Sequence, residues 1–307
     1  MGSIPEYPEY ARVDSGVREN IIEHTAKYPP YSEFNYVNIS SWDLNDSARV
    51  SVLNGNLVIC LPDYMDGTEF YSFLGDNEAC STASTLLDEA ELNSATRELR
   101  LVPEIGASVL ESSGLFNVAE DPDGHDYVLS LAEVAAKRGS KFRNMRHEIS
   151  IFSNRHIGDT VFKDLDVTDL IVQSQIAEVF KGRENLKTEG GHSNDSQSET
   201  QALGRLFELT DLCPLDAYGL EISGELRAFI ICEKISADWY LGHFWKADTA
   251  YRGIYRYLMH QVADRLSGQG YLSMNIEQDL GIAGLRLTKS LFNPSGRLKK
   301  YTVTDKL

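Results

Sequence analysis

Two strand-length apolar segments, 49–53 and 57–61, flank the tripeptide Asn54-Gly55-Asn56. Asn-Gly readily adopts the positive φ angles of a tight turn, so this pattern predicts a β-hairpin. The apolar spacing then alternates between strand and helix periods through the rest of this region. The further elements expected are helix 14–27, strand 69–74, helix 77–93, strand 98–102, helix 104–111 and strand 127–129. The first part of the chain is therefore predicted to be mixed α/β.

The middle of the chain opens with a capping box, Ser130-Leu-Ala-Glu133. Its hydroxyl and carboxylate can satisfy the first free N–H groups of a helix, so a helix is expected to begin here. A second helix is expected over 140–155 and an amphipathic one over 166–182. The polar segment 187–198 contains few apolar residues and predicts a loop, which is either a plain surface loop or an active-site lid.

The second half of the chain repeats the order of elements of the first half. Its expected elements are hairpin 217–222/226–234, strand 239–245, helix 253–267, strand 271–276, helix 282–291 and strand 297–303. Both halves follow the order hairpin, strand, helix, strand, helix, strand, although their sequences share negligible identity. We therefore expect two similarly built domains, an acidic one over 1–136 and a catalytic one over 137–307 that begins with the basic linker helix 140–155.

Charge is distributed unevenly between these halves. The net charge of the 307 residues is −17, and residues 1–136 alone hold 24 Asp and Glu against 6 Lys and Arg. An acidic protein is a poor generic binder of nucleic acid, because phosphates are attracted by Lys and Arg. The basic helix carries Lys141, Arg143 and Arg146, and these residues predict a local surface for tRNA or another phosphate-bearing partner.

The sequence also predicts the cellular compartment. No apolar run approaches the roughly 20 residues that cross a bilayer, and the N-terminal residues lack the basic and apolar regions of a secretory signal. We therefore expect a cytoplasmic protein. The four cysteines are scattered without CxxC spacing, so they are expected to be reduced and buried or half-buried. No metal site and no bound cofactor are predicted.

The segment 275–289 gathers an unusual number of polar side chains at the end of a predicted strand. They are Asn275, Glu277, Gln278, Asp279, Arg286 and Lys289. Strand ends of this kind are where open α/β sheets place their ligands. Arg286 and Lys289 are three residues apart and share one face of the following helix. A charged pocket and a surface ion-pair network both fit this pattern.

Arg252 and Gly253 stand at the start of helix 253–267. A helix start with glycine leaves backbone N–H groups available to an anion, and the arginine adds a positive charge. A phosphate site and an ordinary helix start both fit, since only one glycine is present.

His243 and Lys246 lie in strand 239–245 or directly after it, among aromatic residues. A period of two places His243 and Trp245 on one face of the strand and Lys246 on the other. His243 is a candidate catalytic base and Lys246 a candidate substrate-binding residue. A histidine of the core is the alternative for His243.

Several of these segments resemble the C-terminal domain of phosphatidylglycerol lysyltransferases. The chain is most similar to the soluble, uncharacterised proteins grouped with that domain. The segments that carry the resemblance are Gly242–Asp248, Tyr251–Tyr255, Asn275–Lys289, Pro294 and Leu298–Tyr301, with Tyr31–Phe34, Trp42 and Lys141–Arg146 upstream. Asn275–Lys289 is the specific part.

The resemblance implies an α/β (α+β) fold of two tandem GNAT-like domains, each a mixed, mostly antiparallel sheet flanked by helices. It implies transfer of an aminoacyl group from aminoacyl-tRNA to a hydroxyl or amine acceptor. Asp279 and Glu277 would then recognise the aminoacyl ammonium or assist the nucleophile. Asn275, from its place in the polar segment, is a candidate substrate-binding residue. Arg286 and Lys289 would face the tRNA 3′ end, and Arg252 and Gly253 would replace the pyrophosphate loop of ordinary GNAT enzymes.

Two other functions stay open at this point. One is an acyl-CoA-dependent N-acyltransferase that uses the Arg252-Gly253 helix start for pyrophosphate. The other is a non-catalytic binding module of the same fold. The membrane synthases of this family carry many transmembrane helices, whereas this chain shows none. The expected acceptor is therefore a small soluble molecule, and a lipid headgroup is the alternative.

Overall fold

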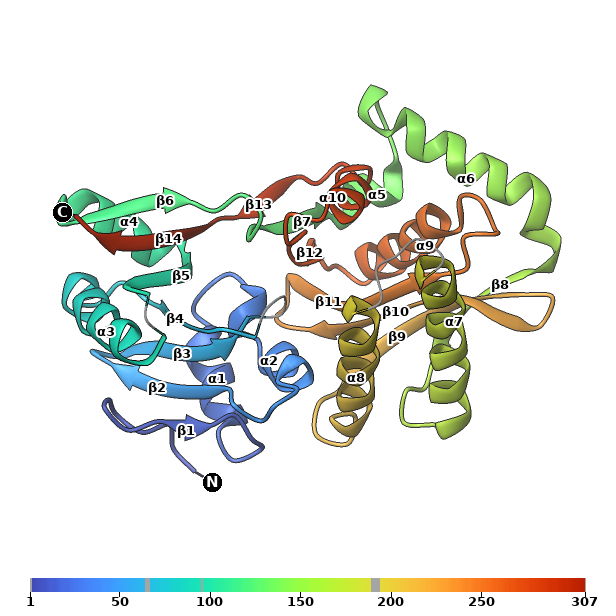
Figure 1. Cartoon of the computed structure of the whole chain (residues 1–307). Coiled ribbons are helices and arrows are strands. Elements are labelled where there is room, and N and C mark those ends of the chain that lie inside the picture. The colour runs from blue at the N-terminus through green and yellow to red at the C-terminus, as the bar shows by residue number, and fades with distance from the viewer. Residues whose placement is uncertain (1, 64–66, 95, 189–193, 307) are drawn as a thin grey trace. The chain divides into compact units, whose positions relative to one another are not determined.

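The computed structural model describes residues 2–63, 67–94, 96–188 and 194–306. The chain divides into two compact units (Figure 1). The first unit is Met1–Asp126 with Gln278–Gly281 and Arg297–Leu307, and the second is Tyr127–Glu277 with Ile282–Gly296. These units differ from the contiguous halves 1–136 and 137–307 expected from the sequence, because two late segments of the chain return to the first unit.

The first unit contains a seven-stranded mixed sheet in the order β1-β2-β3-β4-β5-β14-β6. Its strands are β1 (Ala11–Arg12), β2 (Arg49–Leu53), β3 (Asn56–Pro62), β4 (Glu69–Leu74), β5 (Glu98–Pro103), β6 (Phe116–Glu120) and β14 (Lys300–Asp305). All neighbours are antiparallel except β4 and β5. The last strand, β14, therefore lies between two strands from much earlier in the chain. The predicted hairpin turn is confirmed, with φ of 53° at Asn54 and 78° at Gly55.

Within the described residues of the first unit, four α-helices accompany this sheet. They are α1 (Arg18–Thr25), α2 (Tyr36–Trp42), α3 (Ala79–Ser94) and α4 (Glu104–Ser113), and the 3-10 helix η1 (Ser32–Phe34) precedes α2. Helix α3 places Leu86 and Leu87 on one face, where they are fully buried against Tyr71 and Phe73 of β4. Removing this apolar surface from water is the main source of stability for such a layer.

The second unit also contains a seven-stranded mixed sheet, in the order β13-β7-β12-β11-β10-β9-β8. Its strands are β7 (Asp126–Ser130), β8 (Thr160–Leu165), β9 (Leu215–Ile222), β10 (Glu225–Lys234), β11 (Trp239–Ala247), β12 (Ser273–Asn275) and β13 (Gly296–Leu298). Each neighbouring pair of strands from β8 to β11 is antiparallel, whereas β12 is parallel to β11. Strand β12 is also antiparallel to β7.

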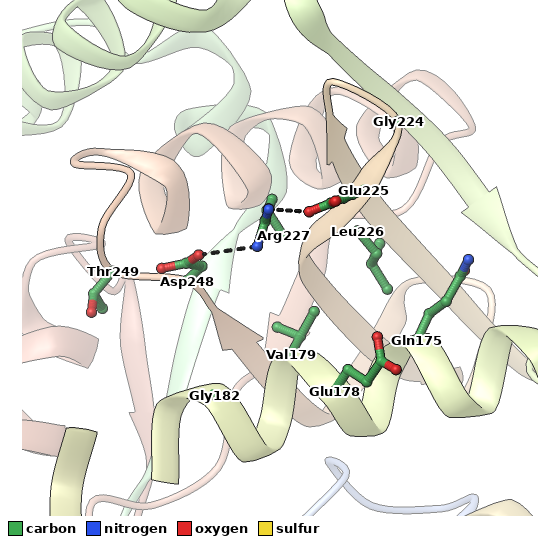
Figure 2. Close-up of a pocket in the computed structure, with 10 residues that line it drawn as sticks. All are labelled: Gln175, Glu178, Val179, Gly182, Gly224, Glu225, Leu226, Arg227, Asp248 and Thr249. Atoms are coloured by element: carbon green, nitrogen blue, oxygen red, sulfur yellow. Dashed lines mark hydrogen bonds and ion pairs between the residues drawn. The ribbon is translucent and has the colours of Figure 1, made fainter. Parts of the chain in front are cut away.

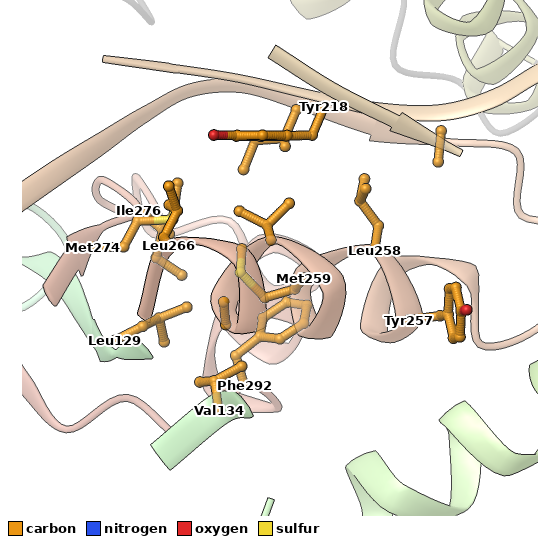
Figure 3. Close-up of a cluster of buried hydrophobic side chains, with 14 of the residues drawn as sticks. Leu129, Val134, Tyr218, Tyr257, Leu258, Met259, Leu266, Met274, Ile276 and Phe292 are labelled. Carbon is orange, nitrogen blue, oxygen red and sulfur yellow. The ribbon is translucent and has the colours of Figure 1, made fainter. Parts of the chain in front are cut away.

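The helices of the second unit flank its sheet. They are α5 (Leu131–Ala136), α6 (Arg143–His156), α7 (Leu170–Thr188), α8 (Asn194–Glu208), α9 (Ile254–Gly268) and α10 (Ala283–Ser290), with 3-10 helices η2 (Ser140–Phe142) and η3 (Ile157–Asp159). Helices α5 and α6 pack against α9, whereas α7 packs against β10 and β11. Leu258, Met259 and Leu266 of α9 are fully buried in one apolar cluster, as Figure 3 shows. The predicted cap is confirmed, because Ser130 Oγ accepts a hydrogen bond from Glu133 N at 3.4 Å.

The expected fold class is confirmed: each unit is a mixed, mostly antiparallel sheet flanked by helices. The loop expected over 187–198 is wrong at its edges. Residues 187–188 end α7, and α8 begins at Asn194 because its later residues Ala202, Leu203 and Leu206 form a buried apolar face. Residues 189–193 lie outside the described residues, so the lid hypothesis falls partly on residues that the structure does not describe.

Within the part of the chain that the structure describes, no helix has both the length and the apolar character needed to cross a membrane. Cys60, Cys213 and Cys232 are buried free thiols and Cys80 is half-buried, as expected.

Candidate functional site

Strand β11 carries a β-bulge at His243. Against β10, Phe244 pairs with Ile231 and Gly242 pairs with Cys232, so His243 is an extra residue in β11. A bulge interrupts the two-residue alternation and turns a side chain in a new direction, and such bulges are frequent beside active sites. The simple alternation expected between His243 and Trp245 is therefore broken at this point.

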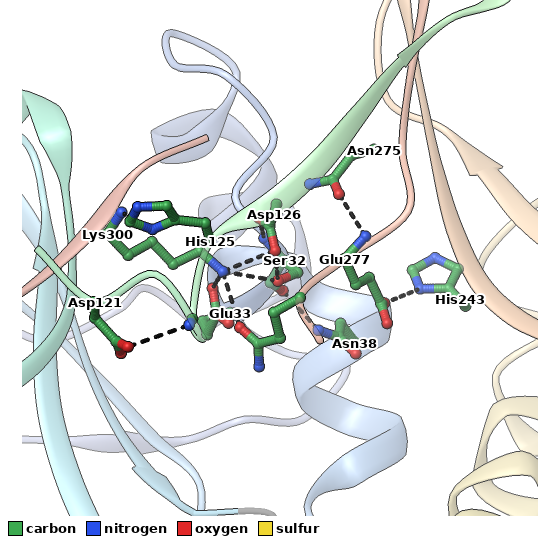
Figure 4. Close-up of polar contacts among 12 residues, drawn as sticks. Ser32, Glu33, Asn38, Asp121, His125, Asp126, His243, Asn275, Glu277 and Lys300 are labelled. Atoms are coloured by element: carbon green, nitrogen blue, oxygen red, sulfur yellow. Dashed lines mark hydrogen bonds and ion pairs between the residues drawn. The ribbon is translucent and has the colours of Figure 1, made fainter. Parts of the chain in front are cut away.

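His243 lies between two carboxylates within the second unit. Its Nε2 is 3.4 Å from Glu233 Oε2, and its Nδ1 is 3.9 Å from Glu277 Oε1. Neither ring nitrogen has a hydrogen-bond partner of good geometry among the described residues. Figure 4 shows the imidazole beside the Glu277 carboxylate. The imidazole therefore lies within ion-pairing distance of both carboxylates.

Exposure distinguishes the three side chains of this site. The side chain of His243 is 1% exposed, that of Glu233 12% and that of Glu277 19%. A general base must come within hydrogen-bond distance of the proton that it removes. Glu277 is therefore the group best placed to meet a substrate, with His243 behind it.

Glu277 is held in an unusual backbone conformation. Its φ is 59°, in the left-handed region that residues other than glycine rarely adopt. The turn is fixed by Asn275, whose Oδ1 accepts a hydrogen bond from Glu277 N at 2.6 Å. Backbone strain of this kind costs about 1–3 kcal/mol and is concentrated at functional sites. Asn275 is fully buried, so its position favours a role in shaping this turn, and direct substrate binding by Asn275 stays a prediction.

Asp279 belongs to the first unit, whereas Glu277 belongs to the second. The Asp279 side chain is buried, and its Oδ1 accepts a hydrogen bond from Gly281 N at 2.9 Å. The next residue, Leu280, donates its N–H to the carbonyl oxygen of Asp123 at 3.1 Å. The polar segment that the sequence presents as one cluster is thus divided between two units.

The remaining predicted substrate-binding residues differ in their surroundings. Lys246 Nζ lies 3.0 Å from both carboxylate oxygens of Glu199 and 5.1 Å from the centre of the Phe180 ring. Arg286 is exposed and Lys289 is partly exposed on α10, a helix without a buried residue. The cations of α10 are therefore accessible to solvent, while Lys246 is already engaged in an ion pair.

Helix α6 lies against the start of α9, where the sequence predicts a phosphate site. Arg252 donates to the Glu148 carboxylate at 2.8 and 3.2 Å, and these bonds lower the pKa of Glu148. Ile254 N, the first N–H of α9, already donates to the carbonyl oxygen of Tyr251 at 3.1 Å. An anion at this helix start would have to replace Glu148 as the partner of Arg252.

Gly253 is required by both its conformation and its neighbours. Its φ is 89°, and a Cβ at this position would lie 2.2 Å from the carbonyl oxygen of Glu148. We expect Gly253→Ala to lower the free energy of unfolding by about 2–4 kcal/mol, because the backbone of α6 must move and the new residue is strained. Chemical denaturation measures this loss.

Gly268, at the other end of α9, is the matched control for this prediction. Nothing lies within 4 Å of a Cβ built there, and its backbone conformation is an ordinary one. Gly268→Ala is expected to change stability by less than about 1 kcal/mol. Equal effects of the two substitutions would contradict the close approach of α6 to α9.

The basic helix of the sequence prediction is also partly engaged. Lys141 Nζ lies 2.7 Å from Glu133 Oε2, and Arg146 donates to the backbone carbonyl oxygens of Lys137 and Gly139. The side chain of Arg143 is exposed. Arg146 therefore stabilises the backbone that follows α5. The role of all three residues in tRNA binding stays a prediction.

A cavity of about 400 Å³ lies elsewhere in the second unit, between α7 and the ends of β10 and β11 (Figure 2). Arg227 is its central charged group; it pairs with Glu225 and lies 3.6 Å from Asp248. None of the residues predicted for the site lines it. The described residues that line it are Gln175, Glu178, Val179, Gly182, Gly224, Glu225, Leu226, Arg227, Asp248 and Thr249.

The sequence interpretation missed two groups of residues. Glu233 follows the buried apolar run of β10, and a carboxylate at such a strand end is the signal that was overlooked. The second group surrounds Lys300 in the first unit, and its members are too far apart in sequence to suggest a cluster. Among the described residues, no group of three or more His, Cys, Asp or Glu side chains is arranged to hold a metal ion.

Comparisons with known proteins identify relatives of the whole fold. The structure of a conserved protein of unknown function from Bacteroides thetaiotaomicron is similar with a TM-score of 0.81 and 24% identity, covering 97% of this chain and 99% of that one. L-PGS from Bacillus licheniformis is similar with a TM-score of 0.59 and 15% identity, covering 99% and 94%. These likenesses cover nearly the whole chain, so the fold of both units is shared with these structures.

No curated protein matches the chain. The family described as "Phosphatidylglycerol lysyltransferase, C-terminal" matches residues 32–304, which include every residue predicted for the site. The resemblance inferred from the sequence is thereby confirmed, and the chain belongs to the family of phosphatidylglycerol lysyltransferase C-terminal domains.

Proposed function

We propose that this protein transfers an aminoacyl group from aminoacyl-tRNA to a hydroxyl or amine on a small acceptor molecule. Family membership supports a transferase of the acyltransferase type. The observation that carries the proposal is the site at the bulge of β11, where His243 lies between Glu233 and the strained, partly exposed Glu277. A buried imidazole with two carboxylates is suited to moving a proton, and acyl transfer to a hydroxyl or amine requires this step.

In the proposed mechanism the acceptor attacks the ester carbonyl carbon of the aminoacyl-tRNA. Glu277 removes the proton of the attacking hydroxyl or amine as the new bond to the carbonyl carbon forms. The tetrahedral intermediate then loses the ribose oxygen of the tRNA, which receives a proton from Glu277. His243 stabilises the changing charge of Glu277 from behind. The ester is already activated, so no covalent intermediate with the enzyme is required, and orientation supplies a large part of the rate.

The other predicted residues bind the donor in this proposal. Asp279 recognises the aminoacyl ammonium, and the exposed cations Arg286 and Lys289 contact the phosphates of the tRNA 3′ end. Arg143, Lys141 and Arg146 extend the contact to the tRNA body. This small set of tRNA-binding residues fits the acidity of the protein, because it restricts the basic surface to a few side chains.

The acyl-CoA alternative receives less support from the start of α9. In that alternative Arg252 and Gly253 hold a pyrophosphate, but Arg252 is paired with Glu148 and the backbone of α6 closely approaches Gly253. A bound pyrophosphate would meet the Glu148 carboxylate at this place, and like charges repel.

The donor is tested with purified protein, charged tRNA and a panel of amines and alcohols. We expect release of deacylated tRNA faster than spontaneous hydrolysis, together with an aminoacylated product. Prior RNase treatment is expected to abolish product formation. If RNase had no effect while acetyl-CoA supported the reaction, the enzyme would be an N-acyltransferase. Binding of neither donor at any salt concentration would favour a non-catalytic binding module.

A further inference from the structure

The first unit encloses a lysine that has no contact with solvent. Lys300, the first residue of β14, is 0% exposed. Its Nζ donates to Asp126 Oδ1 at 2.8 Å, to Gln278 Oε1 at 3.1 Å and to Ser32 Oγ at 3.2 Å, and it pairs with the Glu33 carboxylate. Figure 4 shows Ser32, Glu33 and Asp126 converging on the ammonium group. A buried charge with this many partners is fixed in position, because each partner loses a bond if the charge moves.

The partners of Lys300 are themselves held in place. Ser32 donates its backbone N–H to Asp126 Oδ2 at 2.9 Å and its hydroxyl to Asp126 Oδ1 at 2.7 Å. The backbone N–H of Lys300 donates to His125 Nδ1 at 3.1 Å. The cluster thus joins η1, the start of β7 and β14 into one rigid group.

Charge balance explains why the lysine remains ionised. Burial alone would lower the pKa of Lys300, but the carboxylates of Asp126 and Glu33 outweigh burial and raise it. Burial raises the pKa of Glu33 to about 7, although Lys300 opposes this rise. The ammonium therefore persists near neutral pH, and it can act as a permanent donor to Gln278.

Gln278 connects this cluster to a candidate catalytic residue. It directly precedes Asp279, and its own side chain is buried. On the other side of Asp279, the N–H of Leu280 donates to the carbonyl oxygen of Asp123 at 3.1 Å. Asp279 therefore lies between two anchors, and both of them belong to the first unit.

We propose that Lys300 is a positioning residue for Asp279 and acts through its hydrogen bond to Gln278. This inference rests on the proposed function, because the proposed function gives Asp279 its part in donor recognition. The anchoring of residues 278–281 is a physical property that exists whether or not the protein transfers aminoacyl groups, so the two can be tested separately.

The first arm of the test measures hydrogen exchange in the full chain carrying Gln278→Met. This substitution removes the acceptor but leaves Lys300 with Asp126, Ser32 and Glu33. The N–H groups of Leu280 and Gly281 are the reporters, because both donate hydrogen bonds within the anchored segment. We expect their exchange to become about ten-fold faster or more, since local opening exposes them without global unfolding.

Asn56→Ala is the matched control. Asn56 is also a buried amide of the first unit. Its Nδ2 donates to Asn77 O at 2.7 Å and to Thr82 Oγ1 at 3.0 Å, and neither bond involves residues 278–281. Its loss is expected to leave the exchange of Leu280 and Gly281 unchanged. Unchanged exchange in Gln278→Met, or equal acceleration in the control, would overturn the proposal.

The second arm measures steady-state kinetics with charged tRNA. Asp279 meets only the aminoacyl end of a large donor, so we expect Gln278→Met to lower kcat about ten-fold or more while KM changes less than two-fold. If Gln278 served only the stability of the fold, Gln278→Met and Asn56→Ala would have the same kcat per folded molecule. That result would also overturn the proposal. If the wild type itself transferred nothing, the proposed function would fail and the exchange arm would still decide whether Lys300 anchors the segment.

Discussion

Glu277→Gln is expected to lower kcat for aminoacyl transfer about 10²- to 10⁴-fold, the range that general-base catalysis supplies. The amide keeps the size of the side chain but cannot accept the proton of the nucleophile. Its neighbour His243 is 1% exposed against 19% for Glu277, so Glu277 is the more accessible of the two to an acceptor. The strained backbone at Glu277 is kept, because Asn275 still holds the turn. Single-turnover kinetics with charged tRNA measure the chemical step.

Glu221→Gln is the matched control for this loss. Glu221 lies on β9 in the same unit, its side chain is also 19% exposed, and its partner is Lys163. Its replacement removes a carboxylate of equal exposure far from the bulge in sequence, and kcat is expected to stay within two-fold. Wild-type activity in Glu277→Gln would rule out Glu277 as the base.

Local sequence signals predicted the elements that depend on neighbouring residues. The hairpin at Asn54-Gly55 follows from the positive φ angles of these two residues, and the start of α5 follows from the Ser130 cap. Strands β6 and β8 were missed. Each has only one buried residue, so each is a weaker apolar segment than the central strands of its sheet.

The site was predicted only in part, because part of its geometry depends on contacts between residues far apart in the sequence. Asn275, Glu277 and His243 were recognised from their residue types, and the structure brings these three together within the second unit. The bulge at His243 depends on pairing with β10, which sequence spacing inside β11 cannot reveal. The break between Glu277 and Asp279 likewise depends on contacts made by a distant part of the chain.

The cluster around Lys300 was beyond sequence reasoning because its members are far apart. Lys300 and Ser32 are separated by 268 positions, yet their side chains share a hydrogen bond. Both lie in segments that carry the family resemblance, Leu298–Tyr301 and Tyr31–Phe34. Residue type alone predicts an exposed lysine, since lysines are almost never fully buried unless paired.

Lys300→Met is expected to lower the free energy of unfolding by about 3–5 kcal/mol at neutral pH, because it leaves Asp126 and Glu33 buried without their cation. Guanidinium denaturation followed by circular dichroism measures the loss. Lys299→Met is the control: its side chain is 41% exposed and pairs with Glu120 at the surface. Such surface pairs contribute about 0–1 kcal/mol, so a comparable loss in the control would contradict the buried cluster.

The pH dependence of the free energy of unfolding shows which buried carboxylate causes the loss of stability in Lys300→Met. Burial raises the pKa of Glu33 from 4.5 to about 7, so the folded state binds this proton more tightly than the unfolded state. The resulting stability is fully present below pH 4.5 and is lost as the pH rises through 7. Lys300→Met removes the cation that opposes this rise, so the decline should extend to higher pH and its total size should increase. Adding Glu33→Gln to Lys300→Met should restore part of the stability and flatten the decline, since a neutral amide carries no uncompensated charge. A double variant as pH-sensitive as Lys300→Met alone would exclude Glu33 as the titrating group.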